Sequence, residues 1–333
     1  VIVDPGPHLE RSHVMSIIAQ ESPVYYRDGT TRIGVFFEDE HRQYVPWEEM
    51  PPAYVAALVA AEDGSYWSHH GVAPKHVIRA LRDNAVAGRT VSGGSTLTQQ
   101  TAKNLYYRPD RSWKAKGTEL VNALRLEAHY DKSEILTFYA NQFHVSGNGR
   151  GLGIATRYFF DEPVSDLRTR TDDEKAGEDL VKAAFLAGLV KGPGRYDPFL
   201  GDPERQQASR ERAYDRTRYV LRRIVAEKEE NLVGPWPVPS ARTEAEAHEA
   251  RLRQVRAWKT EAQRLLDEGF ELPFARGRFR YDSSAVLDEV RDRLSEAPFD
   301  EVLKAAGIED PARAGLKVIT TLDPDAQREA TYG

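Results

Sequence analysis

The sequence predicts a mainly α-helical protein with a small β-hairpin near its N-terminus and a mixed α/β region near its C-terminus. Apolar residues recur at helical spacing along most of the chain after Pro51, whereas strand-like runs are confined to the two ends. The 333 residues, of which 40% are hydrophobic, suffice to bury the core of one large domain and a smaller one, or of two medium domains.

The N-terminal elements follow from turn and spacing signals. The segment PVYYRDGTTRIGVFF predicts two short strands joined at Asp28-Gly29, which is a favoured hairpin turn. From Pro51, the run PPAYVAALVAAED predicts an apolar helix that ends at two acids. Further helices are expected near residues 75–87, 96–106, 112–130, 133–142, 151–160, 174–190 and 203–227.

The C-terminal part begins after a Pro-rich break. The segment GPWPVP (234–239) predicts a boundary. A long, highly charged helix of solvent-facing character is expected over residues 241–268. Residues 276–307 are expected to form a small mixed module, and GLKVITTLD predicts one β-strand at the end.

Charge and composition restrict the function. The net charge of −6 argues against general nucleic-acid binding. Between Lys75 and Lys132, however, the chain has eleven Lys or Arg residues and only five Asp or Glu residues. This local excess of positive charge fits either an anionic ligand or a solvated helix face. No run approaches the roughly 18 apolar residues of a membrane span. The absence of cysteine excludes disulfides and thiol catalysis, and fits a reducing compartment or a periplasmic protein without disulfides.

The first motif, EDGSYWSHHG (62–71), places Glu62 and Asp63 at the C-terminal end of the apolar helix, where the helix dipole disfavours negative charge. A carboxylate half-buried there by the following aromatic residues suits a general base, although an ordinary polar helix end has the same appearance. The adjacent His69 and His70 point in different directions on any regular element. We therefore expect hydrogen bonds that shape the loop rather than metal ligation.

The second motif, GGSTLTQQTAKN (93–104), combines glycines, hydroxyls, amides and a lysine. Thr96 and Gln99 have capping-box spacing, so a helix is expected to begin here, and its free N–H groups suit an oxyanion or phosphate. Gln99 and Lys103 lie on one helical face, as do Thr96 and Gln100. The competing interpretation is a Ser/Thr-rich turn that only caps a helix.

Two further motifs follow. In RSWKAKGTE (111–119), Lys116 and Glu119 are three apart on a predicted helix, where a surface ion pair is the simplest interpretation. In KSEILTFYANQF (132–143), the apolar spacing is typical of core, and Asn141 near the end can orient a loop. Acids beside an oxygen-binding, cation-bearing loop suggest sugar chemistry with a phosphorylated leaving group.

In their order and in the residues that they contain, these motifs closely resemble those of the family 51 glycosyltransferases, the peptidoglycan polymerases of class A penicillin-binding proteins. The first motif follows the family form EDxxFxxHxG with Tyr66 in place of Phe, and the second matches GGSTxTQQxxKN throughout. The fourth matches KxxILxxYxN, and RGLGIATRYFF, FLAGLVKGPGRYDP and the Arg216-to-Leu221 stretch are also similar. The third departs from the family form, because Ala115 stands where the family has Arg.

The resemblance covers residues 46–225 and implies a lysozyme-like glycosyltransferase domain there. Residues 1–45 would then be a β-hairpin extension, and 226–314 a helical linker or accessory region. Residues 315–333 resemble the first strand of a transpeptidase-like domain that is truncated or absent, since neither Ser-x-x-Lys nor Lys-Thr-Gly occurs in the chain.

The activity that the resemblance implies is polymerisation of lipid II, in which an acceptor 4-hydroxyl attacks C1 of a polyprenyl-diphosphate-linked donor. Glu62 would be the catalytic base, and Glu119 the second catalytic carboxylate, which orients Lys116 or holds a divalent cation. Substrate-binding roles fall to Asp63, Ser95, Thr96, Gln99, Gln100, Lys103, Asn104 and Lys116.

Two alternatives remain open from the sequence. A lysozyme-like glycoside hydrolase would also use Glu62 and Glu119, but it would not need the lysine-bearing loop. A catalytically weak or inactive scaffold that binds peptidoglycan precursors is supported only by Ala115.

The resemblance also implies partners and a location. The partners are lipid II, the growing glycan strand and the inner-membrane surface, with no nucleic acid. It leaves open other cell-wall synthesis proteins and a divalent cation, Mg or Mn. The implied location is the periplasmic face of the inner membrane, with the membrane anchor outside this chain.

Overall fold

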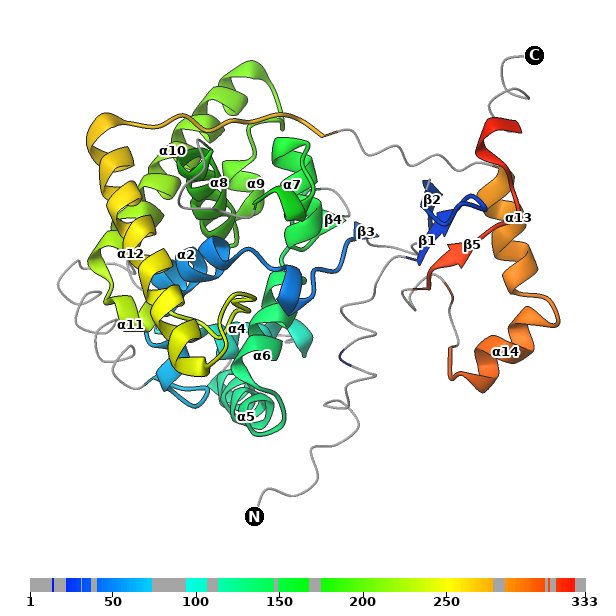
Figure 1. The fold of residues 1–333 in the computed structure, drawn as a ribbon, viewed down its shortest axis with the longest axis horizontal. Helices are drawn as coiled ribbons and strands as arrows, with labels where there is room; N and C mark the ends of the chain where they lie inside the picture. Colours follow the sequence, from blue (N-terminus) through cyan, green and yellow to red (C-terminus); the bar gives the residue numbers. More distant parts are fainter. Residues whose placement is uncertain are drawn as a thin grey trace.

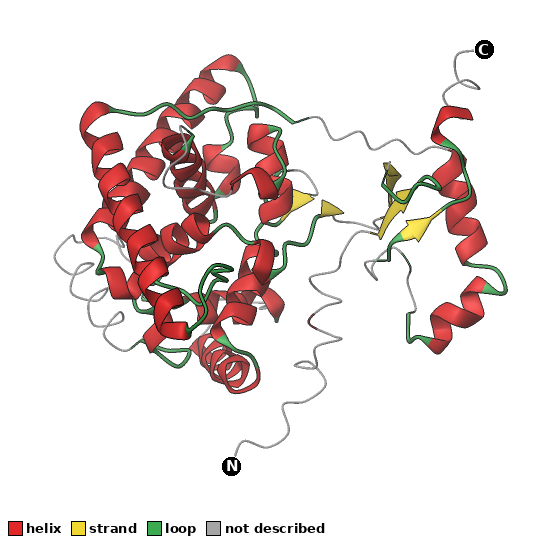
Figure 2. Cartoon of the chain, viewed as in Figure 1, coloured by secondary structure: helices red, strands yellow, loops and turns green. Residues whose placement is uncertain are grey.

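The mainly α-helical architecture expected from the sequence is confirmed (Figure 2). Two groups of elements are described below, a helical body and a small α/β module. Among the described residues, no helix combines the length and the apolar character that a membrane crossing requires. The computed structural model describes residues 14, 22–30, 32–36, 41–73, 94–106, 113–146, 149–167, 175–277, 285–308, 311 and 316–326.

Helix α2 (Pro52–Glu62) lies at the centre of the helical body. Its residues from Ala53 to Ala60 are all buried, as expected for a helix that is apolar on every side. It packs against α8 (Ala176–Leu189), α10 (Pro203–Ala226) and α12 (Glu244–Glu268) (Figure 1). The helix ends at Glu62, and this end is therefore held rigidly by the core.

Helices α4 (Leu97–Leu105), α5 (Trp113–His129) and α6 (Lys132–Ala140) surround a second cluster of the core. The capping box predicted for Thr96 and Gln99 is confirmed, since each of these side chains bonds to the backbone of the other residue. The buried residues of this cluster are Val14, Ala102, Leu105, Ala123, Leu126, Tyr130, Ile135 and Phe138.

Short elements connect the helices of the body. Strands β3 (His41–Arg42) and β4 (Gly149–Arg150) pair in parallel, and β4 comes just before helix α7 (Leu152–Phe160). The remaining elements are 3₁₀ helices at Trp47–Glu49, Tyr66–Ser68 and Val164–Leu167, and helices α9 (Pro193–Tyr196) and α11 (Glu229–Leu232).

Helix α12 corrects one expectation. The charged sequence predicts a solvent-facing helix, but one face of α12 is buried against α10, α8 and α2. Val255 and Trp258 lie in the main core, and Trp258 packs against Trp236 with 5.8 Å between ring centroids. Between the charged residues of α12, apolar residues recur with the helical period. This apolar stripe is sufficient for the helix to pack against the core.

The small module contains the hairpin and the C-terminal strand. Strands β1 (Ser22–Tyr25) and β2 (Arg32–Phe36) are antiparallel, and the turn uses Gly29 at a φ of 66°. Strand β5 (Val318–Ile319) pairs in parallel with β1. Helices α13 (Ala285–Leu294) and α14 (Phe299–Ala305) complete the module. The hairpin and the final strand are therefore confirmed.

The predicted helices from residue 96 to 268 are present with ends displaced by at most three residues. The predicted helix at 75–87 lies outside the described residues. The domain limits at residues 45, 225 and 314 stay predictions.

Asn141 orients the loop that precedes α2, as the sequence predicts. The side-chain Nδ2 donates to the carbonyl oxygen of Val45 at 3.0 Å, and Oδ1 accepts from the backbone N–H of Val45 at 2.8 Å. Nδ2 also donates to the carbonyl oxygen of Thr137 at 2.9 Å. Because Asn141 is buried, bulk water could not replace its side chain as the hydrogen-bond partner of these backbone groups.

We expect Asn141→Ala to lower the free energy of unfolding by about 2–4 kcal/mol, because it leaves buried backbone groups of Val45 without partners. Denaturant unfolding measures the change. The control is Asn231→Ala, which removes one half-buried bond to Glu227 and is expected to cost about 0.5–1 kcal/mol. Equal losses for the two variants would contradict the role of Asn141.

Candidate active site

Glu62 occupies the end of α2, and its side chain is only 3% exposed. Its Oε1 accepts from Nη2 of Arg216 on α10 at 2.8 Å. Its Oε2 lies 3.3 Å from Nζ of Lys191 and 3.5 Å from Nε2 of Gln100 on α4. The carboxylate is therefore fixed by groups from three separate segments, as preorganised chemistry requires.

Asp63, the next residue, joins the first motif to the second. Its Oδ2 accepts from the backbone N–H of Leu97, the first residue of α4, at 2.9 Å. The same oxygen lies 2.9 Å from Nε2 of His69. This carboxylate at the N-terminus of α4 is electrostatically favourable. A substrate-binding role for Asp63 stays a prediction.

His69 belongs to a buried polar network. Its Nδ1 lies 3.4 Å from Nζ of Lys132, which donates to Oε1 of Glu127 at 2.5 Å. The Thr98 hydroxyl donates to the same oxygen at 2.6 Å. Burial lowers the pKa of Lys132, and the bond to Glu127 partly opposes this shift. The network ties α4, α5 and α6 to the first motif, which confirms the hydrogen-bonding role predicted for His69.

Thr96 and Gln99 both lie buried at the start of α4, where each is engaged by the protein. Besides the capping box, the Thr96 hydroxyl donates to the carbonyl oxygen of Gly71 at 2.6 Å. These bonds fix the beginning of α4 against the end of the first motif. The substrate contacts predicted for Thr96 and Gln99 stay predictions, and Gly93 lies outside the described residues.

Lys116 and Glu119 connect the third motif to the second. Lys116 Nζ donates to the Ser95 hydroxyl at 2.9 Å and forms an ion pair with Glu119. The Glu119 side chain is 4% exposed, so this is not the surface ion pair that the spacing alone indicates. The pairing holds the ammonium group of Lys116 beside Ser95, at the edge of the loop that leads into α4.

A pocket of about 360 Å³ lies beside α4, and Gln100 in its lining contacts Glu62. Gln100, Lys103 and Asn104 line it from α4, with Lys103 and Asn104 exposed. The Tyr139 hydroxyl donates to Oε1 of Gln100 at 3.2 Å, while the amide nitrogen of Gln100 reaches Glu62. Gln100 thus connects the pocket to the buried carboxylate. The other lining residues are Tyr139, Gln142, Phe143, His144, Arg150, Val190 and Pro193.

The structure gathers the predicted residues into two neighbouring groups. Gln100, Lys103 and Asn104 line the pocket and Gln100 contacts Glu62, whereas the group of Ser95, Lys116 and Glu119 is not part of its lining. Asp63, Thr96 and Gln99 bond to the backbone at the start of α4 and support this helix.

Sequence reasoning did not identify Arg216 and Lys191 as partners of Glu62. Both lie in stretches that carry the family resemblance, but they are 154 and 129 residues from Glu62. No spacing rule connects residues at such distances, and only the packing of α8 and α10 on α2 reveals the contacts.

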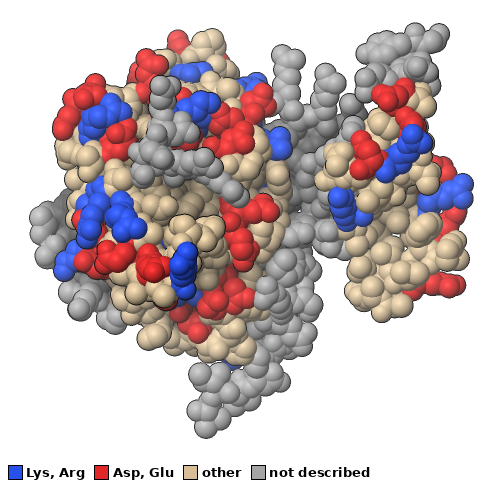
Figure 3. All heavy atoms as spheres, viewed as in Figure 1, with Lys and Arg blue, Asp and Glu red and all other residues tan. Residues whose placement is uncertain are grey.

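The molecular surface does not present a face of one charge in the view of Figure 3, where acidic and basic side chains are interspersed. Among the described residues, no group of three or more His, Cys, Asp or Glu side chains is arranged to hold a metal ion.

Comparison with known proteins finds similarity to a transglycosylase family and to penicillin-binding proteins. A sequence model described as Transglycosylase matches residues 29–225. Penicillin-binding protein 2D of Bacillus subtilis is 34% identical over 192 residues, which cover 58% of this chain and 26% of that protein. Penicillin-binding protein 1A of Aquifex aeolicus is 35% identical over 208 residues, covering 62% and 26%.

A longer match extends over most of the chain. Penicillin-binding protein 1A of Neisseria lactamica is 30% identical over 308 residues, which cover 92% of this chain and 32% of that protein. The chain therefore spans between about a quarter and a third of the length of these relatives.

Proposed function

Because the chain belongs to the transglycosylase family, glycosyltransferase family 51, we propose that it is a peptidoglycan glycosyltransferase that polymerises lipid II into glycan strands. The observation that carries this proposal is the buried Glu62 carboxylate, held by Arg216 and Lys191 beside a pocket that Lys103 lines. A fixed base next to a cation-lined pocket suits a reaction with an anionic leaving group.

In the proposed reaction, the 4-hydroxyl of the acceptor sugar gives its proton to Glu62 as its oxygen attacks C1 of the donor sugar. The bond between C1 and the diphosphate oxygen breaks, and the diphosphate departs with the bonding electron pair. Lys103 and Lys116 stabilise the charge that develops on it. Ser95, Gln100 and Asn104 position the substrate. Arg216 and Lys191 orient the carboxylate of Glu62 toward the acceptor.

The ion pair of Glu119 supports glycosyl transfer over simple hydrolysis. A lysozyme-like hydrolase needs two carboxyl groups that flank the glycosidic bond. Here Glu119 is buried and engaged by Lys116, which is itself bonded to Ser95. We therefore assign Glu119 the task of orienting Lys116. With this pairing and no surrounding group of metal-binding side chains among the described residues, we derive no step through Mg or Mn.

An exposed apolar patch on α5 supports a lipid-linked substrate. Leu120, Val121 and Leu124 are 37%, 48% and 46% exposed, on the helix that carries Lys116 and Glu119. Apolar side chains beside a cationic site suit the polyprenyl chain and the surface of a bilayer. We accordingly propose that the protein works at the periplasmic face of the inner membrane.

Incubation with labelled lipid II tests the function. We expect time-dependent conversion to polymer, measured by separating polymer from monomer on a gel. Binding of lipid II without conversion would favour the scaffold alternative. Cleavage of preformed glycan without any synthesis would favour the hydrolase. Either result would overturn the proposal.

A further inference from the structure

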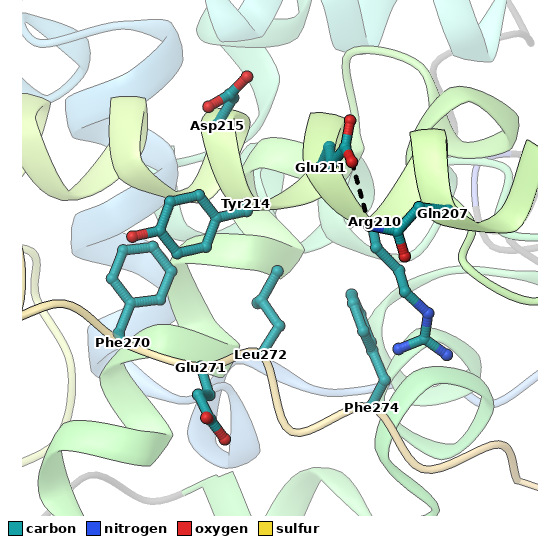
Figure 4. Close-up of a pocket in the computed structure, with 9 residues that line it drawn as sticks. All are labelled: Gln207, Arg210, Glu211, Tyr214, Asp215, Phe270, Glu271, Leu272 and Phe274. Atoms are coloured by element: carbon teal, nitrogen blue, oxygen red, sulfur yellow. Dashed lines mark hydrogen bonds between the residues drawn. The ribbon is translucent and has the colours of Figure 1, made fainter. Parts of the chain in front are cut away.

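A second and larger groove, of about 790 Å³, lies between α10 and the extended segment after α12. It is remote in sequence from the motifs, and one wall lies beyond the residues that the family model matches. Figure 4 shows Tyr214 of α10, and Phe270 and Leu272 of the facing segment, between the helix and that segment, with the carboxyl groups of Asp215 and Glu271 directed outward. The lining residues are Gln207, Arg210, Glu211, Tyr214, Asp215, Phe270, Glu271, Leu272 and Phe274.

The floor of the groove is apolar and preformed. Tyr214 and Phe270 stack with 4.5 Å between ring centroids and 18° between their planes. At the other end, the Phe274 ring packs against Phe160 and Phe185 of the main core, at centroid distances of 6.2 and 5.0 Å. These contacts anchor the 270–274 segment, so a ligand would not have to order it.

The rim of the groove is acidic. The lining contains three acids, Glu211, Asp215 and Glu271, and one cation, Arg210, whose guanidinium lies 5.7 Å from the Phe274 ring centroid. Gln207 donates to Glu211 at 3.0 Å. Within the part of the chain that the structure describes, the side chains of Asp215 and Glu271 form no hydrogen bond or ion pair, and both residues are exposed. The formal charge of the lining is therefore −2.

We propose that this groove binds a short basic peptide segment of a partner protein. An apolar or aromatic side chain of the peptide would pack on Phe270 and Leu272, and its Lys or Arg side chains would lie near Asp215 and Glu271. Arg210 over Phe274 shows that a guanidinium already fits an aromatic face of this groove. The complementary charge supplies the specificity, since an acidic or polyanionic ligand would be repelled.

The absence of cysteine from the sequence permits a site-specific binding assay. Gln207→Cys places a single thiol at the groove, where an environment-sensitive fluorophore can be attached. The probe is the capped peptide Gly-Lys-Phe-Arg-Leu-Lys-Gly. We expect a saturable fluorescence change that weakens with added salt. A peptide with Glu in place of Lys and Arg should give none.

Two double variants, each of which removes two negative charges, test whether the peptide binds in the groove. Asp215→Asn with Glu271→Gln, made in the labelled protein, should weaken binding by about fivefold or more. The control is Glu249→Gln with Glu301→Gln, which removes two exposed charges elsewhere and should change the affinity by less than about twofold. The experiment needs no lipid II, so its outcome is independent of the polymerase activity.

Three results would overturn the proposal. The first is equal affinity for the two double variants. The second is a fluorescence response to a neutral chitin oligosaccharide but not to the basic peptide. The third is a response that depends on protein concentration alone, with matching self-association in sedimentation, which would make a second copy of this chain the occupant.

Discussion

Glu62→Gln is expected to lower the rate of lipid II polymerisation by about 100-fold or more. The substitution keeps the size of the side chain but removes its ability to accept the proton of the acceptor hydroxyl, and loss of a general base has an effect of this order. The carboxylate is buried and held by Arg216 and Lys191, so water cannot readily take its place. The measurement is the initial rate of polymer formation at saturating lipid II.

The effect of losing an ion pair on the rate must be distinguished from the effect of losing a general base. Glu162→Gln is the matched control, because Glu162 binds Lys182 through both oxygens but lies outside the site. We expect this variant to keep the wild-type rate, and both variants to melt within about 5 °C of the wild type. A Glu62→Gln protein that makes polymer at the wild-type rate would remove Glu62 from the mechanism.

Local signals in the sequence were sufficient to predict the helices that carry the site residues. The capping box of Thr96 and Gln99 places the start of α4, because both partners lie within four consecutive residues. The apolar run of α2 likewise predicts a helix that ends at Glu62. In each case the physical cause lies within a few turns of the chain, where spacing has predictive value.

Contacts between distant segments were beyond the reach of such signals. The cationic partners of Glu62 come from α10 and from the residues after α8, and strand β5 pairs with β1 from the opposite end of the chain. The buried side of α12 was misjudged for a related reason. Its charged residues dominate the composition, whereas Val255 and Trp258 are recognisable as core only once α10 is seen beside them.

Lys116→Met is expected to cost about 2–4 kcal/mol of transition-state stabilisation, because it keeps the stem of the side chain and deletes the charge that would face the departing diphosphate. The ratio kcat/KM for lipid II measures this loss. Lys304→Met on α14 is the control, since it likewise breaks an ion pair within a helix, here with Asp300 and outside the site, and should leave kcat/KM unchanged. Because Glu119 is left buried without its cation, the melting temperature is measured in parallel.

Ala115→Arg distinguishes the polymerase from the scaffold. Position 115 lies in the first turn of α5, next to Lys116 in sequence, and the family resemblance implies Arg there. If Lys116 already stabilises the diphosphate, an added cation should leave the rate unchanged or raise it. A scaffold would give no polymer from the wild type and at most a first trace from Ala115→Arg. Wild-type polymerisation that is insensitive to Lys116→Met would instead contradict the assignment of the leaving-group cation, because Lys103 alone would then suffice.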